Sequence, residues 1–383
     1  MADLNTLLHW AIENTPAAQG VSGSGSGSGT AAPANPEGMQ LTFKPAAPGQ
    51  KPNASTLATF HPDDPQHDVG LAPPAAEEPK KDNKLSTEIL DLIMGKPDSV
   101  TMKEKMAIAS NTSADVDERV MALDDFEMLI ELIDNANNMA VLKLWEPLLA
   151  LINDPNEDIA RHALWVAGTA IQNNLKGQAA FYIFGGLPLV LDALYPASGS
   201  KPSGTRAKAV YALSAALKHW PLATVALSAQ DNRGYSVLRA GVADTDLVIR
   251  RKMNFMLGTI VNQARDAFNG EMPNEVRNLI EEQAKTSGAK PGSEGDELLL
   301  ALQREGVFEA AVDALARDPR IDPEDAEYEE NAIRALARAA EYGALSDEEK
   351  SQLQSVWAEW TPIGRAHRGI EGADAEAIDK ALA

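Results

Sequence analysis

Residues 122–130 read Ala-Leu-Asp-Asp-Phe-Glu-Met-Leu-Ile, and the apolar side chains of Leu123, Phe126 and Ile130 fall at positions i, i+3 and i+7. This spacing places the three side chains on one face of an α-helix. The pattern occurs in five places, and the residue before it is alanine in four of them. The other four copies are Leu164, Ala167 and Ile171; Val210, Leu213 and Leu217; Met253, Met256 and Ile260; and Ile333, Leu336 and Ala340.

The copies recur at a regular interval. The first residues of the first four copies are separated by 41, 46 and 43 residues, within the period of about 40–47 residues of HEAT and armadillo repeats. A glycine followed by a second apolar helix also recurs, at residues 185–194 and 306–315. One such unit cannot bury its apolar face alone, so stacked units share a continuous core. The sequence therefore predicts an all-α, armadillo-like helical-repeat solenoid over residues 113–360.

The flanking segments differ from the repeats in composition. Residues 85–112 show a helical pattern and are predicted to form a helical lead-in. Residues 15–84 are rich in Ser, Gly and Pro. Their apolar surface is too small to offset the entropy of ordering, so we expect a disordered linker, which makes up most of a disordered N-terminal extension. Residues 361–383 are expected to be a flexible C-terminal tail.

Residues 1–14 form a separate amphipathic segment. Leu7 and Leu8 fall on its helical pattern, and Trp10 adds a large apolar side chain. A helix of this length is unstable alone in water. Two interpretations stay open: a terminus docked on the body, or a recognition segment that becomes ordered on binding.

The charge is strongly acidic, with 56 Asp and Glu against 34 Lys and Arg and a net charge of −22. Such a chain repels phosphate backbones and anionic lipids, so we expect neither nucleic acid nor a membrane as partner. No apolar run reaches the length of about 18 residues typical of a membrane span. The first residues lack the basic and apolar regions of a secretory signal. We expect a cytoplasmic protein, with an additional nuclear pool as the alternative.

Motifs for catalysis are missing from the sequence. There is no cysteine, and none of the six histidines lies at a metal-ligand spacing. No phosphate-binding glycine loop and no nucleophile motif occur either. We therefore expect no enzyme activity, no catalytic residue, no metal and no cofactor. An undetected hydrolase is the least favoured interpretation.

Side-chain amides gather where the repeat helices end. One Asn can cap a helix, so three of them around a small residue indicate a polar surface that a partner backbone can approach closely. The ends of successive helices lie along one edge of a solenoid, so we expect a row of amides there, with simple capping as the alternative. The residues are Asn135, Asn137 and Asn138 around Ala136; Gln172, Asn173 and Asn174; and Asn262 with Gln263.

The same residues carry a resemblance to a known family. Ile-Asp-Asn-Ala-Asn-Asn at 133–138 and Leu-Lys-Leu-Trp-Glu-Pro at 142–147 resemble the first armadillo repeat of the Fes-type nucleotide exchange factors. These are fungal relatives of the animal heat-shock-protein-binding protein, and they act on heat shock protein 70 chaperones. Residues 168–174 resemble the second repeat, and residues 98–106 the segment before the repeats. The resemblance covers residues 1–14 and about 85–265.

The resemblance implies a function by binding. The solenoid would hold one lobe of the chaperone's ATPase domain displaced, so that ADP leaves and the client is released. The N-terminal segment would compete for the chaperone's substrate-binding domain through Leu7, Leu8 and Trp10. We expect a monomer, and a generic armadillo adaptor is the alternative function. The residues assigned to partner binding are Glu127, Asn135, Ala136, Asn137, Asn138, Asn173, Asn174 and Arg251, with Arg250 as the alternative to Arg251.

Overall fold

The computed structural model describes residues 40–41, 59–60, 95–197, 199–265, 271–287, 294–317 and 325–383. The chain divides into two units, residues 1–83 and 84–383. In the first unit the described residues are two short antiparallel strands, β1 (Gln40–Leu41) and β2 (Thr59–Phe60). They fall inside the stretch predicted as a disordered linker. The predictions for residues 1–14, including Leu7, Leu8 and Trp10, and for residues 85–94 lie outside the described residues.

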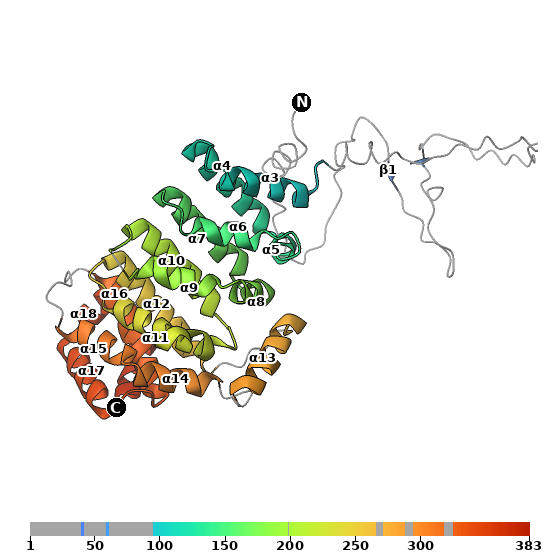
Figure 1. The fold of residues 1–383 in the computed structure, drawn as a ribbon. Coiled ribbons are helices and arrows are strands. Elements are labelled where there is room, and N and C mark those ends of the chain that lie inside the picture. Colours follow the sequence, from blue (N-terminus) through green and yellow to red (C-terminus); the bar gives the residue numbers. More distant parts are fainter. Residues whose placement is uncertain are drawn as a thin grey trace, which may run out of the picture. The chain divides into compact units, whose positions relative to one another are not determined.

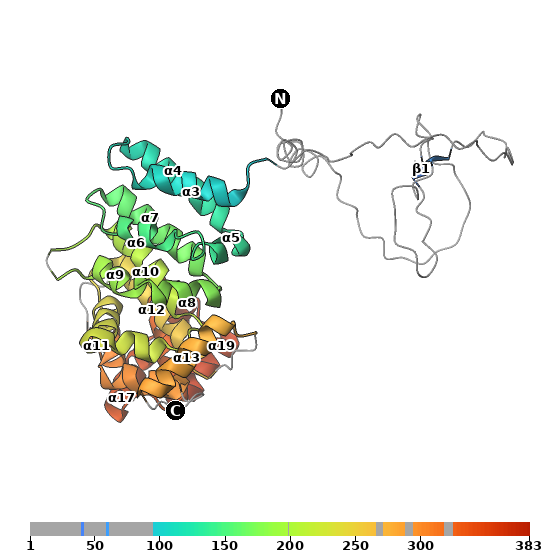
Figure 2. The same cartoon turned by 45° about the vertical axis from the view of Figure 1, so that its right-hand side comes forward.

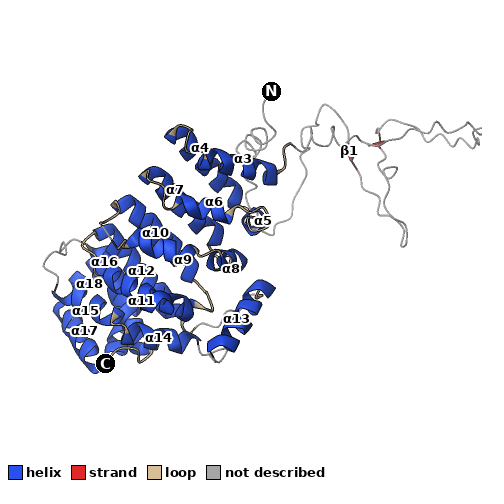
Figure 3. Ribbon diagram, viewed as in Figure 1, coloured by secondary structure: helices blue, strands red, loops and turns tan. Residues whose placement is uncertain are grey.

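The described part of the second unit consists of helices and loops (Figure 3). The first eight helices are α3 (Asp98–Ser110), α4 (Val116–Ile130), α5 (Ile133–Asn138), α6 (Trp145–Leu151), α7 (Glu157–Ile171), α8 (Leu175–Ile183), α9 (Gly186–Leu194) and α10 (Ser203–Leu217). They are followed by α11 (Ala223–Val242), α12 (Leu247–Gln263), α13 (Asn274–Ser287), α14 (Glu294–Arg304), α15 (Val307–Arg317), α16 (Ala326–Glu341), α17 (Asp347–Glu359), α18 (Pro362–His367) and α19 (Gly372–Leu382).

Five helices match the five predicted copies: α4, α7, α10, α12 and α16. Each packs against the next in this order (Figures 1 and 2). We call them the repeat-helix row. Shorter helices such as α6, α9 and α15 pack behind it. The predicted all-α, armadillo-like stack of helices is confirmed.

Polar side chains set where the repeat helices begin. In four of the five, an Asp or Asn before the first turn accepts a hydrogen bond from a backbone N–H of that turn. Such a cap satisfies one of the donors that the helix itself leaves free. The exception is α10, which follows Pro202. The capping residues are Asp115, Asn156, Asp246 and Asp325.

Alignment from these N-caps corrects one of the predicted copies. In α12 the residues that correspond to the third copy are Asn254, Leu257 and Val261, one position after the predicted Met253, Met256 and Ile260. Asn254 is fully buried where the other copies carry Leu, Val or Ile. Its amide donates to the carbonyl oxygens of Val242 (3.0 Å) and Arg250 (2.9 Å). These bonds satisfy its donor in the core.

Arginines connect successive repeats, two of them buried (Arg119 and Arg250) and one partly buried (Arg206). Arg119, Arg206 and Arg250 are each the fourth residue after the N-cap of their helix. Each forms an ion pair with an aspartate at the start of a later helix of the row. For Arg119 the partner is Asp154 (2.5 Å), and its Nε also donates to the carbonyl oxygen of Ala109 (2.8 Å). Because buried ions need their partners, these pairs fix how neighbouring repeats dock.

Residues 361–383 are not a flexible tail, so that prediction is wrong. They form α18 and α19, and α19 packs against α16 and α17. Ile378 and Leu382 are buried, and the indole N–H of Trp357 donates to Asp379 (2.6 Å). Arg368 binds Glu329 of α16 at 2.6 Å. The segment caps the last repeat through a few apolar contacts and ion pairs. Its mostly polar composition gave no sign of these contacts.

An additional helix, α13, follows the fourth repeat. Its Val276 is buried, and Glu275 lies 3.3 Å from Lys176 of α8.

Within the described residues no single helix is long and apolar enough to cross a membrane. Of the described helices, the pair α8 and α9, bent by 83°, has the combined length and apolar composition of a broken span.

Candidate partner-binding surface

Three aromatic side chains occupy the same position on successive helices of the repeat-helix row. Trp165, Tyr211 and Phe255 are each the ninth residue after the N-cap, on α7, α10 and α12. Trp165 and Tyr211 are partly exposed, and Phe255 is 62% exposed. Exposed aromatic side chains on a rigid surface are typical anchors of protein interfaces. We call these three residues the aromatic row.

The sequence predictions missed the aromatic row because of the error in α12. Trp165 and Tyr211 each directly follow the first residue of a predicted copy, Leu164 and Val210. With the fourth copy placed at Met253, the equivalent residue is the buried Asn254, and the regularity disappears. With the corrected alignment, Phe255 completes the row. An aromatic residue at a constant position in successive copies is therefore the signal that sequence reasoning could have used.

A hollow of about 400 Å³ lies beside the aromatic row, between α4, α7 and α10. Thr169 donates from Oγ1 to Oε1 of Glu127 (2.8 Å), and the Tyr211 hydroxyl donates to Oε1 of Gln172 (3.0 Å). These bonds join three helices of the repeat-helix row and fix the side chains around the hollow. Its lining residues are Glu127, Glu131, Trp165, Thr169, Gln172 and Tyr211.

Gly168 lets the Tyr211 ring lie close to α7. A Cβ atom at position 168 would lie 2.5 Å from Cε1 of Tyr211, closer than real Cβ contacts. Any side chain at this position would therefore push the ring away. The glycine and the tyrosine together shape one wall of the hollow.

Charges of opposite sign lie on different helices of the row. Asp124 and Glu127 belong to α4 and Glu131 is its C-cap, whereas Lys208 belongs to α10 and Lys252 to α12. The pKa of Lys208 is lowered by burial and by the positive charge of Lys252, against the opposing effect of Glu127. The exposed face therefore offers carboxylates at one end and ammonium groups at the other.

Part of the predicted row of amides exists. Asn137 and Asn173 line a second hollow, of about 410 Å³, together with Gln178 and His219. The Gln263 side chain accepts a hydrogen bond from the backbone N–H of His219 (2.8 Å). Amides from α5, from the end of α7 and from the end of α12 thus lie along one edge of the repeats. Whether they contact a partner stays a prediction.

For two of the amides, helix capping and hydrogen bonds within the chain explain the position of the side chain. Asn174 is buried and is the N-cap of α8, where its Oδ1 accepts from Gly177 N–H (3.1 Å) and its Nδ2 donates to Ala170 (3.1 Å). The amide of Asn135 donates to Asp98 (2.8 Å) and to the carbonyl oxygen of Leu129 (2.9 Å). Asn138 and Asn173 are exposed, so they stay available at the edge.

The structure corrects the prediction for Ala136. Its side chain is 3% exposed and packs in the core, so it does not form part of the surface. The neighbouring amides suggested a polar surface, but in the short helix α5 the small residue faces inward.

Replacing Ala136 with arginine is therefore expected to unfold α5, because the larger, charged side chain cannot be buried there. We expect a loss of about 3 kcal/mol, measured as a lower melting temperature and faster amide exchange in residues 133–138. The exposed Asn138→Arg is the control and should melt like the parent chain. An unchanged melting temperature for Ala136→Arg would show that this side chain is not confined.

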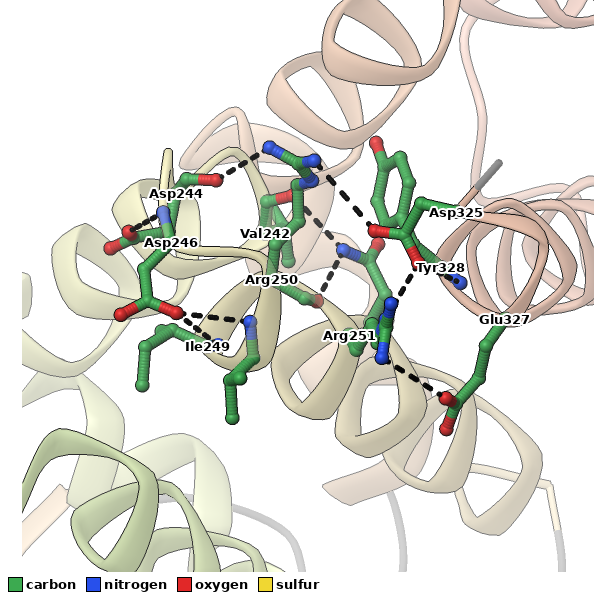
Figure 4. A network of polar contacts seen from close by, with 11 residues as sticks. Val242, Asp244, Asp246, Ile249, Arg250, Arg251, Asp325, Glu327 and Tyr328 are labelled. Atoms are coloured by element: carbon green, nitrogen blue, oxygen red, sulfur yellow. Dashed lines mark hydrogen bonds and ion pairs between the residues drawn. The ribbon is translucent and has the colours of Figure 1, made fainter. Parts of the chain in front are cut away.

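Arg251 is held by intramolecular ion pairs. Its Nε donates to Asp325 (2.6 Å), and Nη1 lies 3.5 Å from Glu327 (Figure 4). Its side chain is 36% exposed, so one side of it still reaches solvent. Arg250, the alternative, is fully buried. Of the two, only Arg251 can touch a partner, and its role in binding stays a prediction.

Comparison with known proteins decides the family. The family model described as "Nucleotide exchange factor Fes1" matches residues 4–139. A protein of Cryptococcus neoformans var. neoformans named "Hsp70 nucleotide exchange factor FES1" is 46% identical over 375 residues, which cover 93% of each chain. The chain belongs to the Fes1 family. The family resemblance found in the sequence is thereby confirmed.

A second relative agrees with the Fes1 assignment, and a solved structure agrees with the fold. A second protein with the same name, from Mycosarcoma maydis, is 39% identical and covers 48% of this chain and 46% of its own length. Among solved structures, a designed armadillo repeat protein in complex with a (KR)4 peptide superposes with a TM-score of 0.50 at 15% identity, over 75% of this chain and 100% of its own. At this identity the superposition shows the armadillo fold alone.

Proposed function

We propose that this Fes1-family chain is a nucleotide exchange factor of heat shock protein 70 chaperones, and that it acts by binding alone. The observation that carries the proposal is the 46% identity, over 93% of both chains, to a relative that bears this name. The exposed aromatic row on a rigid stack of helices supports it, because it offers anchors for a large protein partner.

In the proposed mechanism, the exposed face of the repeat-helix row binds one lobe of the chaperone's ATPase domain and keeps it displaced. The chain must bind the open, nucleotide-free chaperone more tightly than the closed, ADP-bound form. By thermodynamic linkage, ADP or ATP must then weaken the complex by the same factor as the chain weakens nucleotide binding, typically about 5- to 150-fold. The arginine–aspartate pairs between repeats support this mechanism, since the binding surface must resist deformation.

The remaining assignments are also proposals. Residues 1–14 would bind the chaperone's substrate-binding domain through Leu7, Leu8 and Trp10, as a client does. The tether at 15–84 would keep that segment at high local concentration near the bound chaperone. We propose that the chain works as a monomer in the cytoplasm.

The test is the release of fluorescent ADP from a purified heat shock protein 70 chaperone. We expect a stoichiometric amount of the chain to accelerate release, and ATP to dissociate the complex. A chain that lacks residues 1–84 should accelerate ADP release as well as the full chain does. It should lose only the effect on a bound client peptide. No acceleration by the full chain would remove the proposal and leave a generic armadillo adaptor as the alternative.

A further inference from the structure

We propose that the hollow between α4, α7 and α10 binds a cationic side chain, preferably an arginine, on the surface of the protein partner. The partner's identity rests on the proposed function, whereas the preference for a cation rests on the hollow itself. The inference combines three features: two carboxylates, two aromatic rings, and a cavity of the right size.

The carboxylates of the hollow form no ion pair with the described residues; the positive charge of Lys208 acts on Glu127 without such a contact. Glu127 is 9% exposed, and its Oε1 accepts a hydrogen bond from Thr169 (2.8 Å). Its other oxygen makes no hydrogen bond to a described residue. Glu131 is exposed and forms no ion pair with the described residues. A carboxylate that is largely removed from water gains most from a charged hydrogen-bond donor.

The aromatic walls suit the same ligand. The Nζ atom of Lys208 already lies 3.6 Å from the centroid of the Trp165 ring, so this indole binds a cation within the chain itself. Lys208 is not one of the residues that line the hollow, although its Nζ atom also lies 6.0 Å from the centroid of the Tyr211 ring. The hollow offers a cation similar surroundings, with a ring face on one side and carboxylate oxygens on the other.

An arginine fits this combination better than a lysine. Its planar guanidinium can stack on a ring and donate to two carboxylate oxygens at once, whereas an ammonium acts as a point charge. The cavity of about 400 Å³ is large enough for one such side chain together with a few water molecules.

The test uses fluorescein-labelled octapeptides as probes, with alternating Gly-Arg, Gly-Lys or Gly-Glu sequences. Binding to the full chain is followed by anisotropy at 0.15 M salt, which screens the long-range effect of the net charge of −22. The variants are Glu131→Gln and Trp165→Leu. Glu118→Gln is the matched control, because it removes the same charge from an exposed position in the first turn of α4.

We expect the arginine peptide to bind best and the glutamate peptide not to bind. Glu131→Gln and Trp165→Leu should each weaken the arginine peptide about fivefold or more, while Glu118→Gln stays within twofold. Equal weakening by Glu131→Gln and Glu118→Gln would overturn the inference, because net charge alone would then explain binding. So would the absence of a preference for arginine over glutamate.

ADP release, measured on the same variants, separates this inference from the proposed function. If the parent chain accelerates release and the Glu131→Gln and Trp165→Leu variants do so equally well, the inference fails while the function stands. If the parent chain does not accelerate release, the proposed function fails, and the peptide titration alone decides whether the hollow binds cations.

Discussion

Replacing Asp325 with alanine is expected to destabilise the chain by about 3–5 kcal/mol, the largest effect on stability that we predict. Asp325 lies 3.9 Å from the fully buried Arg250 and 2.6 Å from Arg251, and it caps α16 through the N–H of Tyr328 (3.3 Å) (Figure 4). Arg250 makes an ion pair with Asp325 without a hydrogen bond to it. Without Asp325, the neighbours of suitable polarity that this buried guanidinium keeps among the described residues are the carbonyl oxygen of Asp244 (2.8 Å) and the Tyr328 ring.

The measurement is the denaturant midpoint and the melting temperature of Asp325→Ala. The matched control is Asp296→Ala, whose partner Arg265 and own carboxylate are 49% and 64% exposed. An ion pair this exposed contributes at most about 1 kcal/mol. Adding Arg250→Met to Asp325→Ala should restore part of the lost stability, since it removes the uncompensated charge. If the two aspartate variants melt alike, the buried pair does not hold the repeats together.

Replacing Tyr211 with alanine should give the largest loss of chaperone binding, about 30-fold, which corresponds to about 2 kcal/mol. The ring lies over Gly168, contacts the Gln172 side chain, and occupies the middle of the aromatic row. Truncation removes both the central apolar anchor and one wall of the hollow. Binding is measured by calorimetry with the nucleotide-free chaperone.

The control for Tyr211→Ala is Ile183→Ala. Ile183 lies on α8, outside the repeat-helix row, and is 60% exposed, so its truncation also removes exposed apolar surface. Its effect on binding should stay within twofold. Equal losses for both variants would place the contact elsewhere. Because the ring also packs on α7, the melting temperature of Tyr211→Ala is measured as well, and binding is compared at a temperature at which both variants are folded.

Much of the fold could be predicted from the sequence because stacked repeats must bury a regular apolar stripe. The error at Met253 arose because α12 carries a polar residue, Asn254, at a core position. Only the structure shows that two backbone carbonyl groups accept its amide hydrogens there. The same one-residue error hid Phe255 and, with it, the aromatic row.

The site was predicted less well, since adjacent residues on a helix point in different directions. The sequence could not distinguish Arg250 from Arg251, although one is fully buried and the other reaches solvent. It placed Ala136 on the surface because of its polar neighbours. Glu127 was assigned to partner binding without knowledge of its surroundings. The structure adds those surroundings, namely Thr169 and the two rings of the hollow.

Hydroxyl-radical footprinting of the complex with a nucleotide-free heat shock protein 70 chaperone tests the central claim most directly, because it reports the exposure of individual side chains. The oxidation rates of Trp165, Tyr211 and Phe255 should fall together on complex formation. Ile363, which is 84% exposed and lies on α18, should be oxidised at its original rate. If a stable complex leaves the three aromatic side chains as reactive as before, the face of the repeat-helix row is not the binding surface.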